Sequence, residues 1–185
     1  MVAFHGGIYS QWAMTPFAGR DAWIELKPLL DEVGFHGPDE EDEITKRLRG
    51  QRYSTAEKWM MSVKAWAFND LTTLKKIQPL DNPSDIKKLG REVKPFDPAT
   101  WDRIDMAAVT AGSIAKFGVN ERMTAELLGT DDLILVEASK HDRIWGVGLD
   151  WRDELVYDQA NWRGKNKLGR CLMAARAVLR SRQAR

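Results

Sequence analysis

The sequence predicts a mainly α fold with a few short β-strands, in a single domain over residues 1–185. Three observations support this fold class. Helix start signals recur along the chain, where a capping residue precedes apolar residues spaced three and four apart. Stretches with strand character are short and lie near the N-terminus and around residue 135. The length and a hydrophobic content of 43% suit one domain that buries a core.

The N-terminal quarter is predicted to contain strands, turns and an insertion. Residues 1–26 suggest short strands, with a break at Gly6 and Gly7 and an apolar, aromatic strand over Ala22–Leu26. Residues 27–50 are rich in charge and are broken by proline and glycine, so we expect an insertion there with a short exposed helix. A solvated face explains this charge, and no chemistry is expected from it.

The central prediction is a helix over residues 53–68, which Ser54 or Thr55 can cap. Its inward stripe combines apolar side chains with an acid and a base: Glu57, Met60, Met61, Lys64 and Phe68. Charges within an apolar stripe are costly unless they are paired or used. Three interpretations stay open for this helix: a buried Glu57–Lys64 ion pair, a helix exposed to water on both sides, and a catalytic carboxylate in an aromatic pocket.

The rest of the chain is predicted to be helical, with one strand. Further helices are expected over residues 70–77, 82–88, 99–117 and 120–128, with Gly90 ending the second of these, and a last helix from near Asn166. Residues 133–136 suggest a short buried strand, and a glycine-containing loop with Asp142 and Trp145 follows it. The polar segment 149–161 is expected to be a second insertion.

Composition narrows the function classes. A net charge of +1 argues against a broad basic surface for nucleic acid, although not against a local one. A single cysteine, Cys171, excludes an internal disulfide framework and a cysteine-rich zinc site. The sequence shows neither a long apolar run nor a signal-peptide pattern at its N-terminus, so we expect no membrane partner and a cytoplasmic location.

Common catalytic motifs are missing from the sequence. The three histidines show no ligand spacing, so no metal and no other cofactor is predicted. The sequence contains no G-x-S-x-G elbow and no P-loop, and Gly112-Ser113 within a helical run indicates close helix packing. Eight tryptophans are many for this length and suit an aromatic pocket for a flat ring.

The stretch WRGKNKLGR, residues 162–170, is a weak candidate for binding phosphate. Arg163, Lys165 and Lys167 cluster at a predicted helix N-terminus, where free N–H groups would add to their positive charge. The arginines of the C-terminal tail, residues 176–185, are expected to be solvated, with contact to a nucleic-acid backbone as the alternative.

These motifs follow one another in an order that resembles a known family. YSQW and PF lie within residues 9–17, STAEKWMMSVKA is residues 54–65, and LGREVKPFD is residues 89–97, shortly before Trp101. KFGVN, LLGTDDLILVEASKHDRIWGVG and GKNKLGRCLMAAR then occupy residues 116–120, 127–148 and 164–176. Each motif is modest, but the ordered set resembles the NADAR (NAD- and ADP-ribose-associated), or YbiA-like, family.

This resemblance implies a compact, orthogonal helical fold and a metal-independent N-glycosidase activity. Family members hydrolyse the bond between ribose C1 and a base nitrogen, either in ADP-ribosylated guanine of DNA or in early phosphorylated intermediates of riboflavin biosynthesis. The matching positions imply two catalytic acids, Glu57 and Asp142. They also imply substrate-binding residues, namely Trp101, Trp145, Asn166, Lys64, Arg91 and Lys116.

The chemistry of N-glycoside cleavage suits these residue types. Positive charge develops on the ribose ring, and a fixed carboxylate such as Glu57 can stabilise it and deprotonate water. Asp142 could contact ribose hydroxyls or help protonate the leaving base, and the sequence leaves the division of labour between the two acids open. Lys64 could keep Glu57 ionised, and the tryptophans Trp101 and Trp145 could enclose the base.

Three functions remain at this stage. The first is removal of ADP-ribose from guanine in DNA, and the second is cleavage of a small phosphorylated ribosyl substrate. A non-catalytic module that binds ADP-ribose or a nucleotide is the third, although such a module has no evident need for both acids. The basic residues at 163–170 favour DNA slightly.

Overall fold

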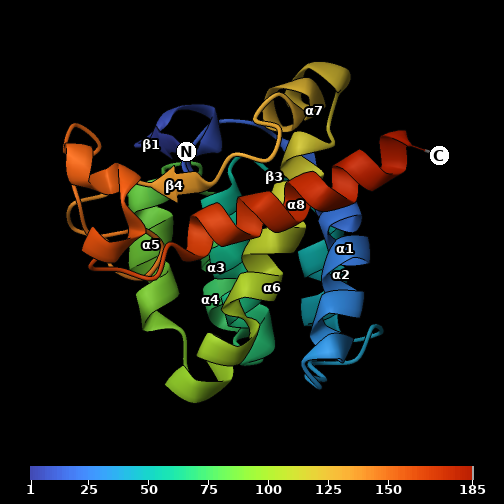
Figure 1. Cartoon of the computed structure of the whole chain (residues 1–185). Coiled ribbons are helices and arrows are strands. Elements are labelled where there is room, and N and C mark those ends of the chain that lie inside the picture. Colours follow the sequence, from blue (N-terminus) through green and yellow to red (C-terminus); the bar gives the residue numbers. More distant parts are fainter. Residues whose placement is uncertain (185) are drawn as a thin grey trace. The chain divides into compact units, whose positions relative to one another are not determined.

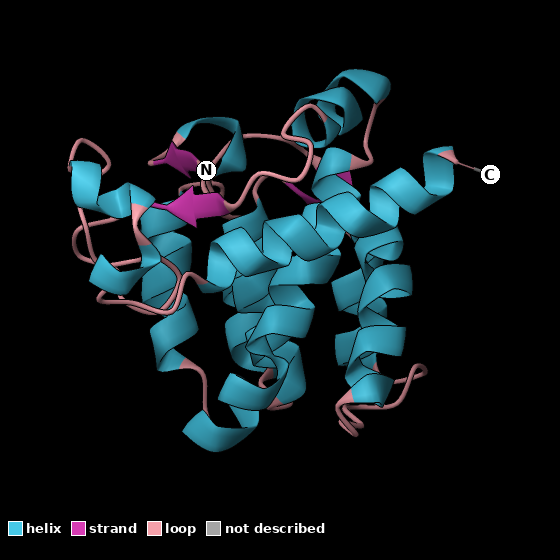
Figure 2. Ribbon diagram, viewed as in Figure 1, coloured by secondary structure: helices cyan, strands magenta, loops and turns pink. Residues whose placement is uncertain are grey.

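The computed structural model describes residues 1–184 and confirms a mainly α fold with a few short strands (Figures 1 and 2). The chain forms two compact units, one of residues 14–116 and one that combines residues 1–13 with the chain from Phe117 onward. The single domain over residues 1–185 stays a prediction. Among the described helices, none is long and apolar enough to cross a membrane.

The unit of residues 14–116 is a helical bundle with a two-stranded antiparallel ribbon, in which Phe17 pairs with Tyr53. In chain order its elements are β2 (Phe17–Ala18), α1 (Gly19–Glu32), α2 (Glu43–Gly50), β3 (Arg52–Tyr53), α3 (Ala56–Ala67), α4 (Leu71–Ile77), α5 (Pro83–Glu92) and α6 (Pro98–Phe117, whose last residue opens the other unit). One hydrophobic core that includes Trp59 and Trp66 joins these elements apart from α5, which packs on α3.

The strand predicted over Ala22–Leu26 is wrong, because these residues lie within helix α1. Ala22, Trp23, Leu26 and Leu30 are buried at helical spacing. Five apolar residues are too few to distinguish strand from helix by pattern alone. The helix continues through Pro28, a residue that disfavours helix interiors, and the buried face outweighs this cost.

Helix α3 confirms the central helix, and Thr55 is its cap, with its side chain accepting a hydrogen bond from the Lys58 N–H. Its burial exceeds the predicted single stripe, since side chains are buried all around the helix. The Trp59 indole donates to the Ala108 carbonyl of α6 over 2.9 Å. A Cβ on Gly112 would lie 2.5 Å from the Trp59 ring, so this glycine serves close helix packing, as predicted.

Helix α5 runs through Gly90, which does not end it as predicted. A Cβ at this position would lie 2.0 Å from the Met61 sulfur of α3. The glycine therefore allows α5 to pack closely on α3, and a short window of sequence cannot distinguish this use from a helix stop.

The second unit is built on a parallel strand pair, in which Val2 pairs with Leu135 and Phe4 with Glu137. Its elements are β1 (Val2–Phe4), the 3₁₀ turn η1 (Gly7–Tyr9), α7 (Glu121–Leu128), β4 (Leu135–Glu137), the 3₁₀ turns η2 (Glu154–Tyr157) and η3 (Gln159–Asn161), and α8 (Lys167–Gln183). Val136, Val147 and Val156 are fully buried in its small core. The segment 149–161 therefore contributes to a core in addition to forming turns.

Candidate functional site

The predicted site residues fall into two sets, one in each unit. The helix set consists of residues on α3, α5 and α6: Glu57, Lys64, Arg91, Trp101 and Lys116. The loop set consists of residues between β4 and α8: Asp142, Trp145 and Asn166. Each set is organised by a different kind of interaction.

Glu57 is a buried acid in the first turn of α3, with 3% of its surface exposed. The capping residue Thr55 fixes the start of the helix, and the helix dipole favours a carboxylate at this position. A carboxylate on a packed helix has few rotamers open to it, so its position is well defined.

Lys64 lies two turns further along α3 and has partners other than Glu57. Its ammonium donates to the Gly90 carbonyl over 2.8 Å and lies 4.0 Å from the Phe96 ring centre and 5.8 Å from that of Trp101. Burial, and then the charge of Arg91, lower the pKa of Lys64. Because Trp101 is half-buried and Phe96 is exposed, this cluster offers a cation and two aromatic faces to a ligand.

Lys116 is the most deeply buried member of the helix set, with 1% of its surface exposed near the end of α6. Burial lowers the pKa of its ammonium to about 7. An amine that loses its charge near neutral pH can accept a proton, a property that a surface lysine binding phosphate does not have.

Asp142 shapes the loop that contains it. One carboxylate oxygen, Oδ1, accepts hydrogen bonds from the backbone N–H groups of Ile144 (2.9 Å) and Trp145 (2.8 Å). The Asp142 carbonyl accepts from Gly148 over 3.1 Å. Within residues 1–184, Oδ2 makes no hydrogen bond, so half of this carboxylate is available to a ligand while the other half maintains the turn.

Asn166 connects the loop to the strand pair. Its side-chain amide accepts from the Glu137 N–H over 3.0 Å and donates to the Leu135 carbonyl over 2.9 Å, so that it bonds to β4 as a neighbouring strand would. The residue has a left-handed backbone, with φ of 49°, and is 2% exposed. These bonds define a structural role for Asn166, and its substrate contact stays a prediction.

The free N–H groups expected at the start of α8 are not available for phosphate. The N–H groups of Lys165, Asn166, Lys167 and Leu168 donate to backbone carbonyls of residues 143–146 over 2.9–3.2 Å. The glycines of this stretch serve close approach, since a Cβ on Gly164 would lie 2.3 Å from the Gly146 carbonyl oxygen. The cradle prediction was wrong in this respect because the loop supplies the acceptors itself.

The loop also pairs an aromatic ring with a cation. The ammonium of Lys167 lies 6.0 Å from the centre of the Trp145 ring, and Trp145 is half-buried. Lys167 itself is 5% exposed, unlike Lys165, whose side chain is exposed. Each set therefore combines a tryptophan with a lysine.

Glu137, the last residue of β4, is a candidate that the sequence analysis missed. It is 9% exposed, and its Oε2 atom is buried without a hydrogen-bond partner in residues 1–184. Burial, and then the negative charge of Asp142, raise the pKa of its carboxyl to about 7. An acid directly after the predicted apolar strand of residues 133–136 was the signal that could have identified it.

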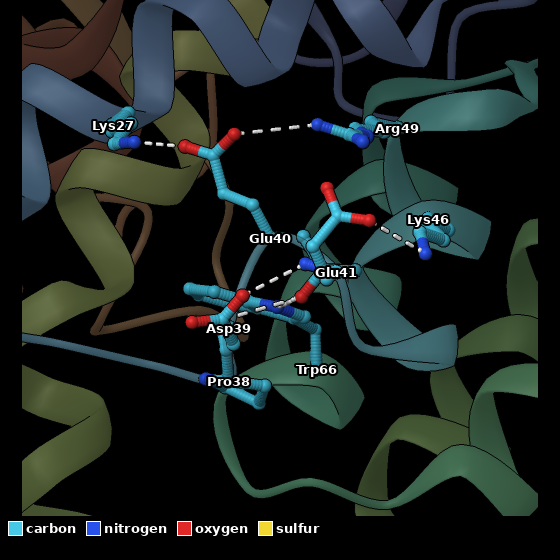
Figure 3. Close-up of polar contacts among 9 residues, drawn as sticks. Lys27, Pro38, Asp39, Glu40, Glu41, Lys46, Arg49 and Trp66 are labelled. Atoms are coloured by element: carbon cyan, nitrogen blue, oxygen red, sulfur yellow. Dashed lines mark hydrogen bonds and ion pairs between the residues drawn. The ribbon is translucent and has the colours of Figure 1, made fainter.

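Residues of the charged block at 27–50 help to line a hollow, and no predicted site residue is among those that line it. Figure 3 shows the carboxylate of Glu40 bonded to Lys27 of α1 and, over 3.4 Å, to Arg49 of α2. These residues line a hollow of about 800 Å³ with Trp23. The short helix predicted here is present as α2 and is exposed on one face, whereas its other face, including Ile44 and Leu48, is core. The core face was hidden by the surrounding charges.

Part of the arginine tail is structural, contrary to expectation. Arg176 is buried and donates to the Thr130 hydroxyl over 2.7 Å and to the Leu133 carbonyl over 2.9 Å. Arg180 bonds to Asp132 over 2.7 Å. These arginines stabilise the turn before β4, which leaves them less free for a nucleic-acid backbone.

Residues 1–184 contain no group of three or more histidine, cysteine or acidic side chains able to hold a metal ion. Cys171 is buried in α8. The two sets together bring acids, lysines and aromatic rings to a mainly helical domain.

The chain belongs to the NADAR domain family, since residues 5–180 match the NADAR domain. It is 40% identical to N-glycosidase R617 of Acanthamoeba polyphaga mimivirus over 124 residues, which are 67% of this chain and 73% of that protein. It is also 34% identical to Protein irg-1 of Caenorhabditis elegans over 140 residues, 75% of this chain and 66% of that protein.

Two further comparisons cover the fold and a longer relative. The NMR structure of the E. coli protein YbiA matches with a TM-score of 0.67 and 21% identity, covering 99% of this chain and 86% of that one, which shows a shared fold. Riboflavin biosynthesis protein VVA0006 of Vibrio vulnificus is 28% identical over 116 residues, 63% of this chain and 29% of that protein. The YbiA-like fold expected from the resemblance is confirmed.

Proposed function

We propose that this NADAR domain is a metal-independent N-glycosidase that removes ADP-ribose from ADP-ribosylated guanine in DNA. The observation that carries this proposal is the buried carboxylate of Glu57, held by a capped helix that also bears Lys64 beside Trp101. Relatives named N-glycosidase, R617 among them, support the reaction class. The exposed side chains of Arg163, Lys165 and Arg170 support a DNA substrate.

Each residue has a defined task in this reaction. Glu57 stabilises the positive charge that develops at ribose C1 and takes a proton from the attacking water. Trp101 and Lys64 bind a ring and a negatively charged group of the substrate, with Arg91 as a further cation. Asp142 uses its free oxygen for a ribose hydroxyl or for the leaving base, and Trp145 supplies a second aromatic face.

A small phosphorylated ribosyl substrate is the second candidate. The similarity to a riboflavin biosynthesis protein specifically favours it, with early phosphorylated intermediates of riboflavin biosynthesis as the substrates. The structural role of Arg176 and the pairing of Arg180 with Asp132 also reduce the positive charge free for DNA. Both candidates use the same bond cleavage and the same acids.

The test compares wild-type protein, Glu57→Gln and a matched control on both substrates. Glu32→Gln removes an exposed acid at the end of α1 in the same unit and serves as the control. ADP-ribose release from an oligonucleotide carrying ADP-ribosyl guanine is followed by chromatography, with a parallel assay of the riboflavin intermediates. We expect Glu57→Gln to lose about a hundredfold or more in rate and Glu32→Gln to match wild type.

The outcomes separate the proposals. Release from DNA that Glu57→Gln abolishes supports the DNA substrate and the catalytic carboxylate together. Cleavage of the riboflavin intermediates without release from DNA rejects the DNA substrate and supports the small phosphorylated substrate. A folded Glu57→Gln variant with full turnover removes Glu57 from the mechanism, and a folded wild type that is inactive on both substrates rejects the N-glycosidase proposal.

A further inference from the structure

The main chain of Glu137 is held by hydrogen bonds from the loop between β4 and α8. Its N–H donates to Asn166 Oδ1 over 3.0 Å, and its carbonyl accepts from Val147 N over 2.9 Å. A Cβ on Gly146 would lie 2.8 Å from the Glu137 carbonyl oxygen and 3.2 Å from its Cγ. The backbone of Glu137 is thus held through its N–H by Asn166 and through its carbonyl by Val147, with Gly146 packed against it.

The oxygens of this carboxyl group lack the partners that a buried carboxylate needs. Oε2 is buried without a hydrogen bond from residues 1–184, and Oε1 lies 3.7 Å from His5 Nδ1, beyond hydrogen-bond distance. A buried, ionised and unpaired carboxylate is costly, so the neutral form that carries a proton is favoured here. A protonated carboxyl group offers an O–H donor to whatever group approaches it.

The charged neighbours differ in their effect on this proton. Asp142, on the following loop, is an acid whose negative charge favours the neutral form of Glu137, and burial acts in the same direction. His5, on the turn after β1, is half-exposed and would oppose them only when protonated. On α8, the ammonium of Lys167 lies near the Trp145 ring. A carboxyl group that keeps its proton beside a second acid is an arrangement that acid–base catalysis uses.

We propose that Glu137 is the general acid of the reaction and protonates the leaving base. This inference rests on the proposed function and narrows the role of Asp142 to maintaining the turn, contacting ribose and keeping Glu137 protonated. When the C1–N bond breaks, its electron pair passes to the base nitrogen, which takes the proton from Glu137. Water adds to C1 and loses a proton to the general base of the proposed function, which then releases that proton to solvent. Solvent returns a proton to Glu137, so the cycle is balanced.

The test measures kcat against pH for wild type, Glu137→Gln and Glu121→Gln on whichever substrate wild type cleaves. Glu121 is an exposed acid on α7 in the same unit, so its variant is the matched control. We expect wild-type kcat to fall as the pH rises above about 7, because the acid must be protonated. Glu137→Gln should lose about 10²- to 10⁴-fold in kcat together with this alkaline fall, while KM changes little.

A substrate whose base is permanently cationic through N-methylation provides a second measurement, because its base departs neutral and needs no proton. Glu137→Gln should cleave it at nearly the wild-type rate. The inference is overturned if Glu137→Gln keeps the wild-type rate and its fall at alkaline pH. It is also overturned if the variant loses the same factor in rate on both substrates, because a purely structural role would have that effect. If wild type cleaves no substrate, the proposed function itself fails.

If Glu137→Gln does not fold, NMR of the wild-type protein with ¹³C-labelled glutamate can measure the protonation of the Glu137 carboxyl instead. A Glu137 carboxyl that still carries its proton at pH 6 supports the inference. One that titrates near 4.5, the ordinary value for glutamate, overturns it.

Discussion

The helix set and the loop set hold their polar groups by different means. Glu57 and Lys64 lie on a helix that Thr55 caps and that hydrophobic side chains surround. The loop between β4 and α8 has little regular structure, and Asp142 and Asn166 maintain its shape through hydrogen bonds to backbone groups. The comparison predicts that a residue of the loop set has a structural task in addition to any catalytic one, whereas Lys64 of the helix set can be changed with little effect on the fold.

The largest effect on stability should come from Asn166→Ala. The change leaves the Glu137 N–H and the Leu135 carbonyl buried without their partner and places alanine in a left-handed backbone. We expect the free energy of unfolding to fall by about 3–5 kcal/mol. Asn120→Ala, which removes only the cap of α7, is the control and should cost about 1 kcal/mol. Equal losses in urea unfolding would contradict the bridging role.

Asp142 allows the two tasks of one loop residue to be separated. Asp142→Asn keeps an oxygen that can accept from Ile144 and Trp145 but removes the charge, so we expect nearly normal stability and a rate lower by about a hundredfold, or about 2.7 kcal/mol. Asp142→Ala should lose about 1–3 kcal/mol of stability as well. Thermal unfolding and turnover of the two variants, measured side by side, check this. Identical stabilities would show that the turn does not depend on Asp142.

Glu137 predicts a pH-dependent difference in stability. Its carboxyl has a folded pKa of about 7 against an ordinary 4.5, so the native state retains a proton that the unfolded state loses between these values. The contribution of this group is fully present below pH 4.5 and is lost as the pH rises through about 7. Wild type should therefore lose stability relative to Glu137→Gln between pH 5 and 8. A difference in melting temperature between wild type and Glu137→Gln that stays constant across this pH range would contradict the raised pKa.

Lys116 predicts the opposite trend in the helix set. Its folded pKa of about 7 lies below the ordinary 10.5, so wild type should gain stability as the pH rises from 7 to 10. Lys116→Met replaces the buried ammonium with an apolar side chain. We expect its free energy of unfolding to exceed that of wild type by about 1–2 kcal/mol at pH 6, and this difference should shrink toward pH 10. Denaturant unfolding at both pH values measures this. An advantage that is the same at both would exclude the lysine charge as its cause.

The smallest effect should come from Lys64→Met. The variant loses a hydrogen bond to Gly90 and contacts with two aromatic rings but retains its apolar stem, so we expect a change in the free energy of unfolding within about 1 kcal/mol. Urea unfolding beside Asn166→Ala checks the contrast between the sets directly. A loss as large as that of Asn166→Ala would show that the helix set is no less structural than the loop set.

The sequence by itself determined the class of fold, most of the helices and the candidate acids. Capping signals at Thr55 and Asn120 act over three or four residues, so they can be read locally and proved correct. The ordered motifs predicted the family, which the match over residues 5–180 confirmed. These features depend on neighbouring residues and on the order of residues along the chain.

Only the tertiary structure decided how several of these residues are used. Gly90 resembles a helix stop until Met61 is seen beside it, and the N–H groups at the start of α8 look free until residues 143–146 accept their bonds. The protonation of Glu137 likewise follows from burial and from Asp142. Burial, close approach and hydrogen-bond partners between distant segments arise when the chain folds, and local sequence patterns do not contain them.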